Sequence, residues 1–139
     1  MKKKTFLFFN ISTKGTRITV SYDINDNNGT ITSPDFPSSY PNYIRRLWNI
    51  TVPSGKQVKL HFMSFYLHSS VICKYDFVEI RDGHLPSSRR IVRMCGHQRS
   101  EKTLYSRGRH LRIYFETDAY DGSYSGFQVS YKAVGKWFQ

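Results

Sequence analysis

Apolar and polar residues alternate with a period of two along much of the chain. The alternation is clearest in five segments, residues 47–52, 58–62, 76–80, 111–115 and 127–131, and a further segment covers 17–22. Because successive side chains of a β-strand point to opposite faces, each segment predicts a strand with one buried face. Gly, Pro, Asn and Ser recur between the segments, as in tight turns, and no helical period appears. The pattern predicts an all-β fold, a sandwich of two antiparallel sheets.

The first third of the chain is less regular. Residues 1–16 show no sustained period, 23–29 read as a turn cluster, and three prolines within 31–41 argue against a central strand there. The start, Met1 to Phe9, resembles the opening of a signal peptide, but its apolar run stops at Asn10 and is too short. We therefore expect these residues to mark a fragment start. No apolar run in the sequence reaches the length of a membrane span.

The formal net charge is +11, from 21 Lys and Arg against 10 Asp and Glu. A charge of this size favours anionic partners, and a sulfated glycan or an acidic protein surface fits. Arg107, Arg109 and Arg112 form one of several basic clusters, and parity places Arg112 on the solvent side of its strand. Two interpretations stay open, a polyanion-binding surface or scattered solvated charge. A nucleic-acid partner is not expected, because no recognised nucleic-acid motif is present.

Two cysteines, Cys73 and Cys95, and three N-x-S/T sequons point to the secretory route. The sequons begin at Asn10, Asn28 and Asn49. Asn49 points to the face of its strand opposite the apolar residues, as a glycan requires. In an oxidising compartment the two thiols would pair. We therefore expect a secreted or extracellular glycoprotein with one disulfide.

Catalytic chemistry finds little support in the sequence. The five histidines show no pair at metal-ligand spacing. The segment 122–126 superficially resembles a nucleophile elbow, but its central residue is Tyr124 in place of Ser. We expect a binding module and not an enzyme.

Several spaced motifs resemble the CUB domain family. They are Gly29 to Pro37 (GTITSPDFP), Tyr40-Pro41-Asn42, Trp48-Asn49-Ile50, Cys73 to Gly83 (CKYDFVEIRDG), Cys95-Gly96, Phe115 to Asp118 (FETD) and Gly126-Phe127. The resemblance covers 28–132 and implies a jelly-roll-like sandwich of two antiparallel sheets, an extracellular context and protein or carbohydrate binding. It leaves 1–27 as an N-terminal extension, with a first strand near 17–22, and 133–139 as a C-terminal tail.

The sequence departs from the family in its disulfides. The family usually has two, and the first would join a residue near Val20 to the position of Arg46, where this chain has no cysteine. The CUB modules of platelet-derived growth factors C and D also lack it. The remaining bridge, Cys73 to Cys95, closes a loop of about 20 residues and is expected to contribute about 3 kcal/mol.

The second departure concerns calcium. Many family members bind the ion through a Glu and two Asp, with a Tyr supporting the Glu. The resemblance places the aspartates at Asp76 and Asp118 and the tyrosine at Tyr40, but His68 replaces the Glu. Asp76 shares the strand parity of Val78 and Ile80, so we expect its carboxylate on the core side of the sheet end, where it needs a cation or hydrogen bonds. Calcium prefers oxygen ligands, so two interpretations stay open. The aspartates either accept hydrogen bonds from Tyr40, an Arg or a neighbouring loop, or form a weakened calcium site helped by Asp121 or by carbonyl groups of 118–123.

Loop aromatics complete the candidate binding residues. Tyr120 and Tyr124 follow Asp118, and tyrosine combines a large contact area with few rotatable bonds. We expect the binding face at the sheet end that holds Tyr40, His68, Asp76, Asp118 and Tyr120, where His68 would make binding sensitive to mildly acidic pH. The chain is then a non-catalytic extracellular binding module, with or without calcium dependence. The alternatives are an accessory module of a larger secreted protease or receptor, or a matrix polyanion binder.

Overall fold

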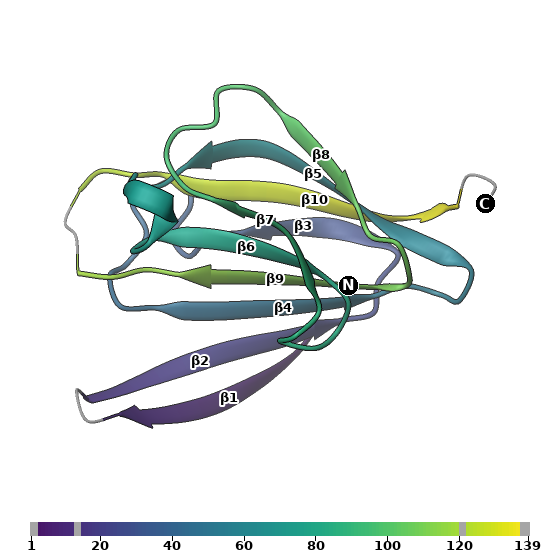
Figure 1. The fold of residues 1–139 in the computed structure, drawn as a ribbon, viewed down its shortest axis with the longest axis horizontal. Coiled ribbons are helices and arrows are strands. Elements are labelled where there is room, and N and C mark those ends of the chain that lie inside the picture. The colour runs from purple at the N-terminus through teal and green to yellow at the C-terminus, as the bar shows by residue number, and fades with distance from the viewer. Residues whose placement is uncertain (1–2, 13–14, 120–121, 137–139) are drawn as a thin grey trace.

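A computed structural model describes residues 3–12, 15–119 and 122–136, and it shows a sandwich of two β-sheets (Figure 1). The larger sheet has the strand order β1 (Lys3–Ser12), β2 (Gly15–Ile24), β4 (Arg45–Thr51), β9 (His110–Glu116), β6 (Phe77–Asp82) and β7 (Arg89–Met94). The smaller sheet has the order β3 (Asn28–Thr32), β10 (Gly126–Gly135), β5 (Lys56–Tyr66) and β8 (Lys102–Tyr105). The all-β sandwich predicted from the sequence is confirmed.

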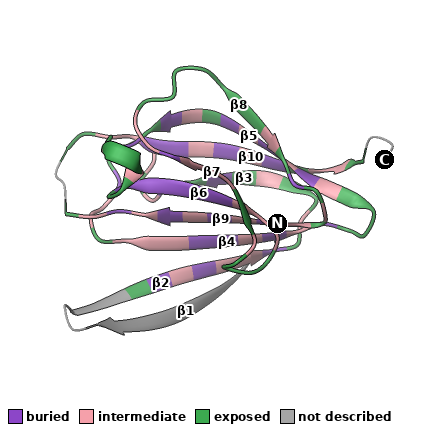
Figure 2. Cartoon of the chain, in the orientation of Figure 1, coloured by how far each residue is buried: buried purple, intermediate pink, exposed green. Residues whose placement is uncertain are grey.

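The core lies between the two sheets and follows from the alternation in the sequence. Along β4 and β9, buried and partly exposed residues alternate (Figure 2). Trp48 and Phe115 from the larger sheet meet the edge of Phe127 from the smaller sheet, with ring centroids 5.9 and 5.2 Å apart. Edge-to-face packing of this kind adds to the burial of the rings themselves. The two sheets are thus joined through one aromatic centre.

All six predicted strands are present, and four more were not predicted. β1 pairs with β2 along its whole length, so the expected N-terminal extension supplies two strands of the larger sheet. β3 begins inside the expected turn cluster and ends before the prolines. β7 and β8 are edge strands whose exposed positions are mostly charged or polar, which hides the alternation. The sheets are also not wholly antiparallel, because β2 pairs with β4 in parallel.

A disulfide joins Cys73 to Cys95, as the sequence predicted, with the Cα atoms 5.5 Å apart. It ties the short 3-10 turn Val71–Cys73 to the chain after β7. Ser70 supports the same turn, because its hydroxyl accepts hydrogen bonds from the backbone N–H groups of Lys74 and Tyr75. The described part of the chain contains no helix with the length and apolar character that a membrane crossing requires.

Candidate functional site

The first candidate region is the end of the sandwich where β6 begins and β9 ends, here called the tyrosine end. Tyr40 donates a hydrogen bond from its hydroxyl to Oδ2 of Asp76 at 2.7 Å and accepts one from the backbone N–H of His68 at 3.0 Å. The other oxygen of Asp76 accepts the backbone N–H of Asp118 at 2.8 Å. Four chain segments are therefore joined through one tyrosine and one carboxylate.

Both side chains at the centre of this network, Asp76 and Tyr40, are buried. Asp76 is 1% exposed and Tyr40 is 8% exposed, so neither offers surface to a partner. Burial raises the pKa of the Tyr40 hydroxyl well above its usual range, the hydrogen bond from His68 opposes that shift, and the hydrogen bond to Asp76 adds to it. The tyrosine therefore stays a neutral donor. Parity had predicted that Asp76 enters on the core side, and the structure shows it there with hydrogen-bond donors on both oxygens.

The same residues can be tested against a calcium ion. Both oxygens of Asp76 already accept hydrogen bonds, Oδ1 of Asp118 accepts the N–H of Ala119 at 2.8 Å, and the third acidic position is His68. Within the described residues, no three or more His, Cys, Asp or Glu side chains come together as a metal site. Asp121, the predicted helper, lies outside the described residues. This donor set is poorer in oxygen than calcium requires.

An aromatic cluster covers the tyrosine end. The Tyr124 ring stacks near Tyr40 at 6.5 Å and meets the edge of Tyr66 at 5.3 Å, and Tyr66 stacks on His97 at 4.4 Å. Tyr66 and His97 are exposed, whereas Tyr124 is half-buried and folds over the network. Tyr120, the other predicted tyrosine, lies outside the described residues. Among the described rings of this cluster, Tyr66 and His97 are the exposed ones, and the sequence analysis had not selected them.

The second candidate region is the outer face of β6, β7 and β9. Here Arg81, Arg90 and Arg93 pair with Glu79, and Arg112 lines a pocket together with Glu79 and Arg81. We call these four arginines and their carboxylate the arginine face. The Glu79 carboxylate contacts Arg81 at 3.0 Å, Arg93 at 2.9 Å and Arg90 at 3.4 Å. Burial alone would raise the pKa of Glu79, but hydrogen bonds and charge from Arg93, with Arg81 and Arg90, lower it overall. One ionised carboxylate therefore forms ion pairs with three arginines.

The four arginines differ in how many contacts their guanidinium groups make within the fold. Arg93 lies over the Phe77 ring at 3.8 Å and donates to the Cys73 carbonyl, and Arg81 donates to the Ser88 carbonyl at 2.7 Å. Arg112 makes no ion pair among the described residues. It lies on the outer face, as parity predicted, but is half-buried, and burial first and the charge of Arg81 second lower its pKa. Arg90 and Arg112 are thus the members with most hydrogen-bonding capacity left.

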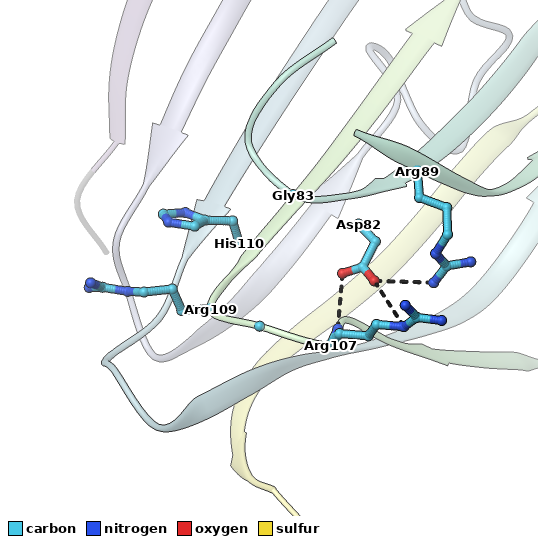
Figure 3. A pocket seen from close by; sticks show the side chains of 7 residues that line it. Asp82, Gly83, Arg89, Arg107, Arg109 and His110 are labelled. Atoms are coloured by element: carbon cyan, nitrogen blue, oxygen red, sulfur yellow. Dashed lines mark hydrogen bonds and ion pairs between the residues drawn. The ribbon is translucent and has the colours of Figure 1, made fainter. Parts of the chain in front are cut away.

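The third candidate region is a pocket of about 270 Å³ at the opposite end of β6 from Asp76 (Figure 3). We call it the end pocket, and its lining residues are Asp82, Gly83, Arg89, Arg107, Gly108, Arg109 and His110. The structure therefore separates the three arginines that the sequence analysis had grouped. Arg107 and Arg109 line this pocket, whereas Arg112 belongs to the arginine face. Asp82 was not selected from the sequence, since only the pairing of β6, β7 and β9 brings it together with Arg89 and His110.

Two of the predicted sequon asparagines, Asn28 and Asn49, have described side chains, and their settings differ. Asn28 is exposed at the start of β3. Asn49 lies on the outer face of the larger sheet, as parity predicted, but it is half-buried and its side-chain amide donates to Asp23 at 3.4 Å. The side chain of Asn10 lies outside the described residues. Glycosylation at the three positions stays a prediction.

Comparison with known proteins agrees with this architecture. Residues 20–131 match the CUB domain family. Human Tolloid-like protein 1 is 32% identical over 111 residues, which are 80% of this chain and 11% of that protein. Human Mannan-binding lectin serine protease 1 is 34% identical over 120 residues, covering 81% of this chain and 17% of that protein. The chain thus spans less than a fifth of either relative, and the relatives are larger secreted or extracellular proteins.

Solved structures lead to the same family. The CUB1-EGF-CUB2 domains of rat MASP-1 superpose with a TM-score of 0.74 at 31% identity, over 82% of this chain and 42% of that one. The MASP-1 CUB2 domain bound to Ca2+ superposes with a TM-score of 0.68 at 29% identity, over 79% of this chain and 96% of that one. Calcium binding therefore occurs among the structural relatives. CUB domains are non-catalytic modules, even where the whole relative is a protease, and this chain belongs to the CUB domain family.

Proposed function

We propose that this chain is an extracellular, non-catalytic accessory module of a longer secreted protein, and that it binds a sulfated glycan through the arginine face. The observation that carries the proposal is the arrangement of four arginines around the single carboxylate of Glu79 on three adjacent strands. The disulfide and the extracellular relatives support the compartment.

The geometry of the arginine face suits an extended polyanion. Arg90, Arg81 and Arg112 occupy neighbouring positions in the register of β7, β6 and β9, so their side chains form a row across the strands. Adjacent strands lie about 4.8 Å apart, which spaces the guanidinium groups along a line. Guanidinium groups bind tetrahedral oxyanions through two parallel hydrogen bonds. A linear chain carrying repeated sulfate groups matches this row.

The chemistry of the surface favours a glycan over a protein. Protein interfaces are built around a desolvated apolar or aromatic centre, with charge at the rim. The described large apolar residues with the greatest exposure, Val71 and Ile72, lie on the 3-10 turn and outside the row of arginines. The centre of the arginine face is instead a salt-bridged carboxylate.

The test is heparin chromatography of the oxidised protein in a sodium chloride gradient. We expect retention, and we expect the double variant Arg90→Gln/Arg112→Gln to elute at clearly lower salt. The matched control is Lys59→Gln/Lys132→Gln, which removes two positive charges from two paired positions of the smaller sheet. The control should elute close to the wild type, because exposed charges far from the ligand are screened.

Equal shifts for both double variants would show that net charge alone drives retention, and the proposal would be abandoned. Arg93 is left in place, because its contacts with Phe77, Glu79 and Cys73 support the fold. Circular dichroism of all variants checks that the sandwich is intact.

A second candidate function rests on the exposed rings of the tyrosine end. Tyr66 and His97 stack at 4.4 Å and are both exposed, and stacked aromatic side chains are typical anchors of protein interfaces. A protein partner would then bind this end. Tyr66→Ala would abolish capture of such a partner and leave heparin retention unchanged, which separates the two functions.

A further inference from the structure

The end pocket lies at the end of the sheet, next to the arginine face. In the pairing of β6 with β7, Arg81 lies opposite Arg90, and the next pair is Asp82 opposite Arg89. The pocket is completed by the turn between β8 and β9, which carries Arg107 and Arg109. Consecutive strand residues point to opposite faces, so Asp82 and Arg89 do not extend the row of arginines but lie beside it, at the end of the sheet.

Asp82 lies beneath the arginines of the pocket and joins two of them through hydrogen bonds. Its side chain is 6% exposed and accepts the backbone N–H of Arg107 at 2.9 Å and Nη2 of Arg89 at 3.1 Å (Figure 3). The carboxylate thereby attaches the β8–β9 turn to the end of β6. Because this carboxylate is covered, the surface of the pocket is formed by the arginines and not by the acid. The Arg89 and Arg107 side chains remain 52% and 79% exposed.

The other side of the pocket is formed by Arg109 and His110. Arg109 donates from Nε to the Val52 carbonyl at 2.9 Å, which orients the guanidinium, and no further hydrogen bond of that group occurs among the described residues. His110 contacts the Thr51 hydroxyl through Nδ1 at 3.0 Å. In Figure 3 the Arg109 and His110 side chains project to the same side, away from the cluster around Asp82. The pocket thus presents cations along two sides.

The charge balance of the pocket is positive and can increase. Three arginines and one aspartate line the pocket, and the His84 ring lies 4.7 Å from the His110 ring. Burial first, and then the charges of His84 and Arg109, lower the pKa of His110. On the β4 side the neighbour of His110 is the uncharged Thr51, and the acid in the pocket, Asp82, is already paired with arginines. A bound anion would relieve the repulsion among these cations.

We propose that the end pocket is a subsite for a single sulfated sugar unit, and that it binds more tightly when His110 is protonated. The inference rests on the proposed glycan-binding function and adds the position of one sulfate group. The volume of about 270 Å³ is below that of typical drug-sized ligand pockets and suits one sugar ring with its sulfate. Gly108 leaves its side of the pocket open, because a Cβ there would meet no atom within 4 Å.

The sign of the pH effect follows from linkage. An anion next to the His110 imidazole stabilises its charged form, so the pKa of His110 is higher in the complex than in the free protein. Binding therefore takes up protons, and affinity rises as pH falls and is lost as pH rises through the pKa of the complex. The arginines are charged throughout this range and give no such dependence.

The test uses two probes, inorganic sulfate and a sulfated heparin disaccharide, at constant ionic strength with chloride as the balancing anion. The His84 and His110 ring resonances are followed by NMR between pH 5 and 8. We expect saturable shifts with both probes, tighter binding at the lower pH, and tighter binding of the disaccharide. Arg107→Gln/Arg109→Gln should weaken binding about tenfold, since it removes charge-assisted hydrogen bonds. Lys59→Gln/Lys132→Gln is the matched control and should not change it.

Asp82→Asn is the complementary variant. The amide oxygen can still accept the Arg107 N–H, while the negative charge is removed, so we expect tighter sulfate binding. Because the expected result is a gain of affinity, misfolding of the variant could not produce it.

The outcomes separate this inference from the proposed function. Shifts that are the same in chloride alone, or sulfate binding unchanged in Arg107→Gln/Arg109→Gln, would overturn the pocket. Sulfate binding without disaccharide binding would show a site for the free anion and overturn the sugar subsite. If the protein is not retained on heparin but the disaccharide still binds here with the expected pH dependence, the proposed function fails and the pocket stands. If retention depends on Arg90 and Arg112 but the pocket variants change nothing, the pocket alone fails.

Discussion

The two ends of β6 each carry an aspartate, in opposite settings. Asp76 at one end is buried and accepts hydrogen bonds from a tyrosine and a backbone N–H. Asp82 at the other end is also covered but is paired with arginines whose side chains are half or more exposed. The first arrangement uses its polar atoms to hold loops together. The second leaves cationic groups at the surface, and this difference places the candidate binding chemistry at the end with Asp82.

The largest expected effect concerns the tyrosine end. Asp76→Ala removes the acceptor for the Tyr40 hydroxyl and the Asp118 N–H and leaves both donors buried, which should lower the free energy of unfolding by about 3 kcal/mol. Asp82→Ala, the matched change, should cost about 1 kcal/mol, because its arginine partners can turn to water. Urea denaturation of both variants measures the difference. Equal losses would contradict the contrast between the two ends.

A smaller effect is expected on the arginine face. Glu79→Gln leaves three arginines without their shared charge and should lower the free energy of unfolding by about 2 kcal/mol at neutral pH. Since the folded-state pKa of Glu79 is below 4.5, its stabilising contribution is present above that pH and is lost as the pH falls through the folded-state pKa. Urea denaturation between pH 3 and 7 should therefore show the wild type and the variant converging at the acidic end. If the difference in the free energy of unfolding between wild type and variant stays constant with pH, the Glu79 carboxylate is not the source of the pH dependence.

The end pocket should show a weaker pH effect in a different range. The pKa of His110 is lower in the folded protein than its usual 6.5, so the unfolded chain binds the proton more readily. Stability is then complete above about pH 6.5 and decreases as the pH falls through the folded-state value. His110→Asn should flatten the stability curve in that range, and sulfate should do the same for the wild type. An unchanged slope in His110→Asn would assign the effect to another group.

The smallest effect is expected from calcium. The described residues at the tyrosine end offer two carboxylates with hydrogen bonds already made, so millimolar calcium should change the melting temperature of the wild type by no more than about 1 °C. His68→Glu restores the acidic position that the family resemblance indicates and should make melting respond to calcium. A clear shift in the wild type would show that Asp121 or loop carbonyls complete the site. If calcium changes the melting temperature of neither protein, the remaining residues do not form a calcium site even with the acidic position restored.

Much of the sandwich could be predicted because strand alternation is local. Trp48 and Ile50 on one strand, or Leu111 and Ile113 on another, show which face is buried without knowledge of the partner strand. β7 could not be recognised in the same way, because Arg89, Arg90 and Arg93 occupy an edge strand that buries little. β1 had no periodic signal and is defined by its pairing with β2. Edge strands depend on register with a neighbour, which lies outside the local pattern.

The sequence by itself determined the all-β class, the six periodic strands, the single disulfide and the core-side position of Asp76, since each depends on residue type and spacing along the chain. Only the tertiary structure decided which charges act together. It assigned Asp76 to Tyr40 and Asp118, gathered four arginines around Glu79, and separated Arg107 and Arg109 from Arg112. These groupings follow from strand order and register, which join residues far apart in the chain and are set by the whole core rather than by any one segment.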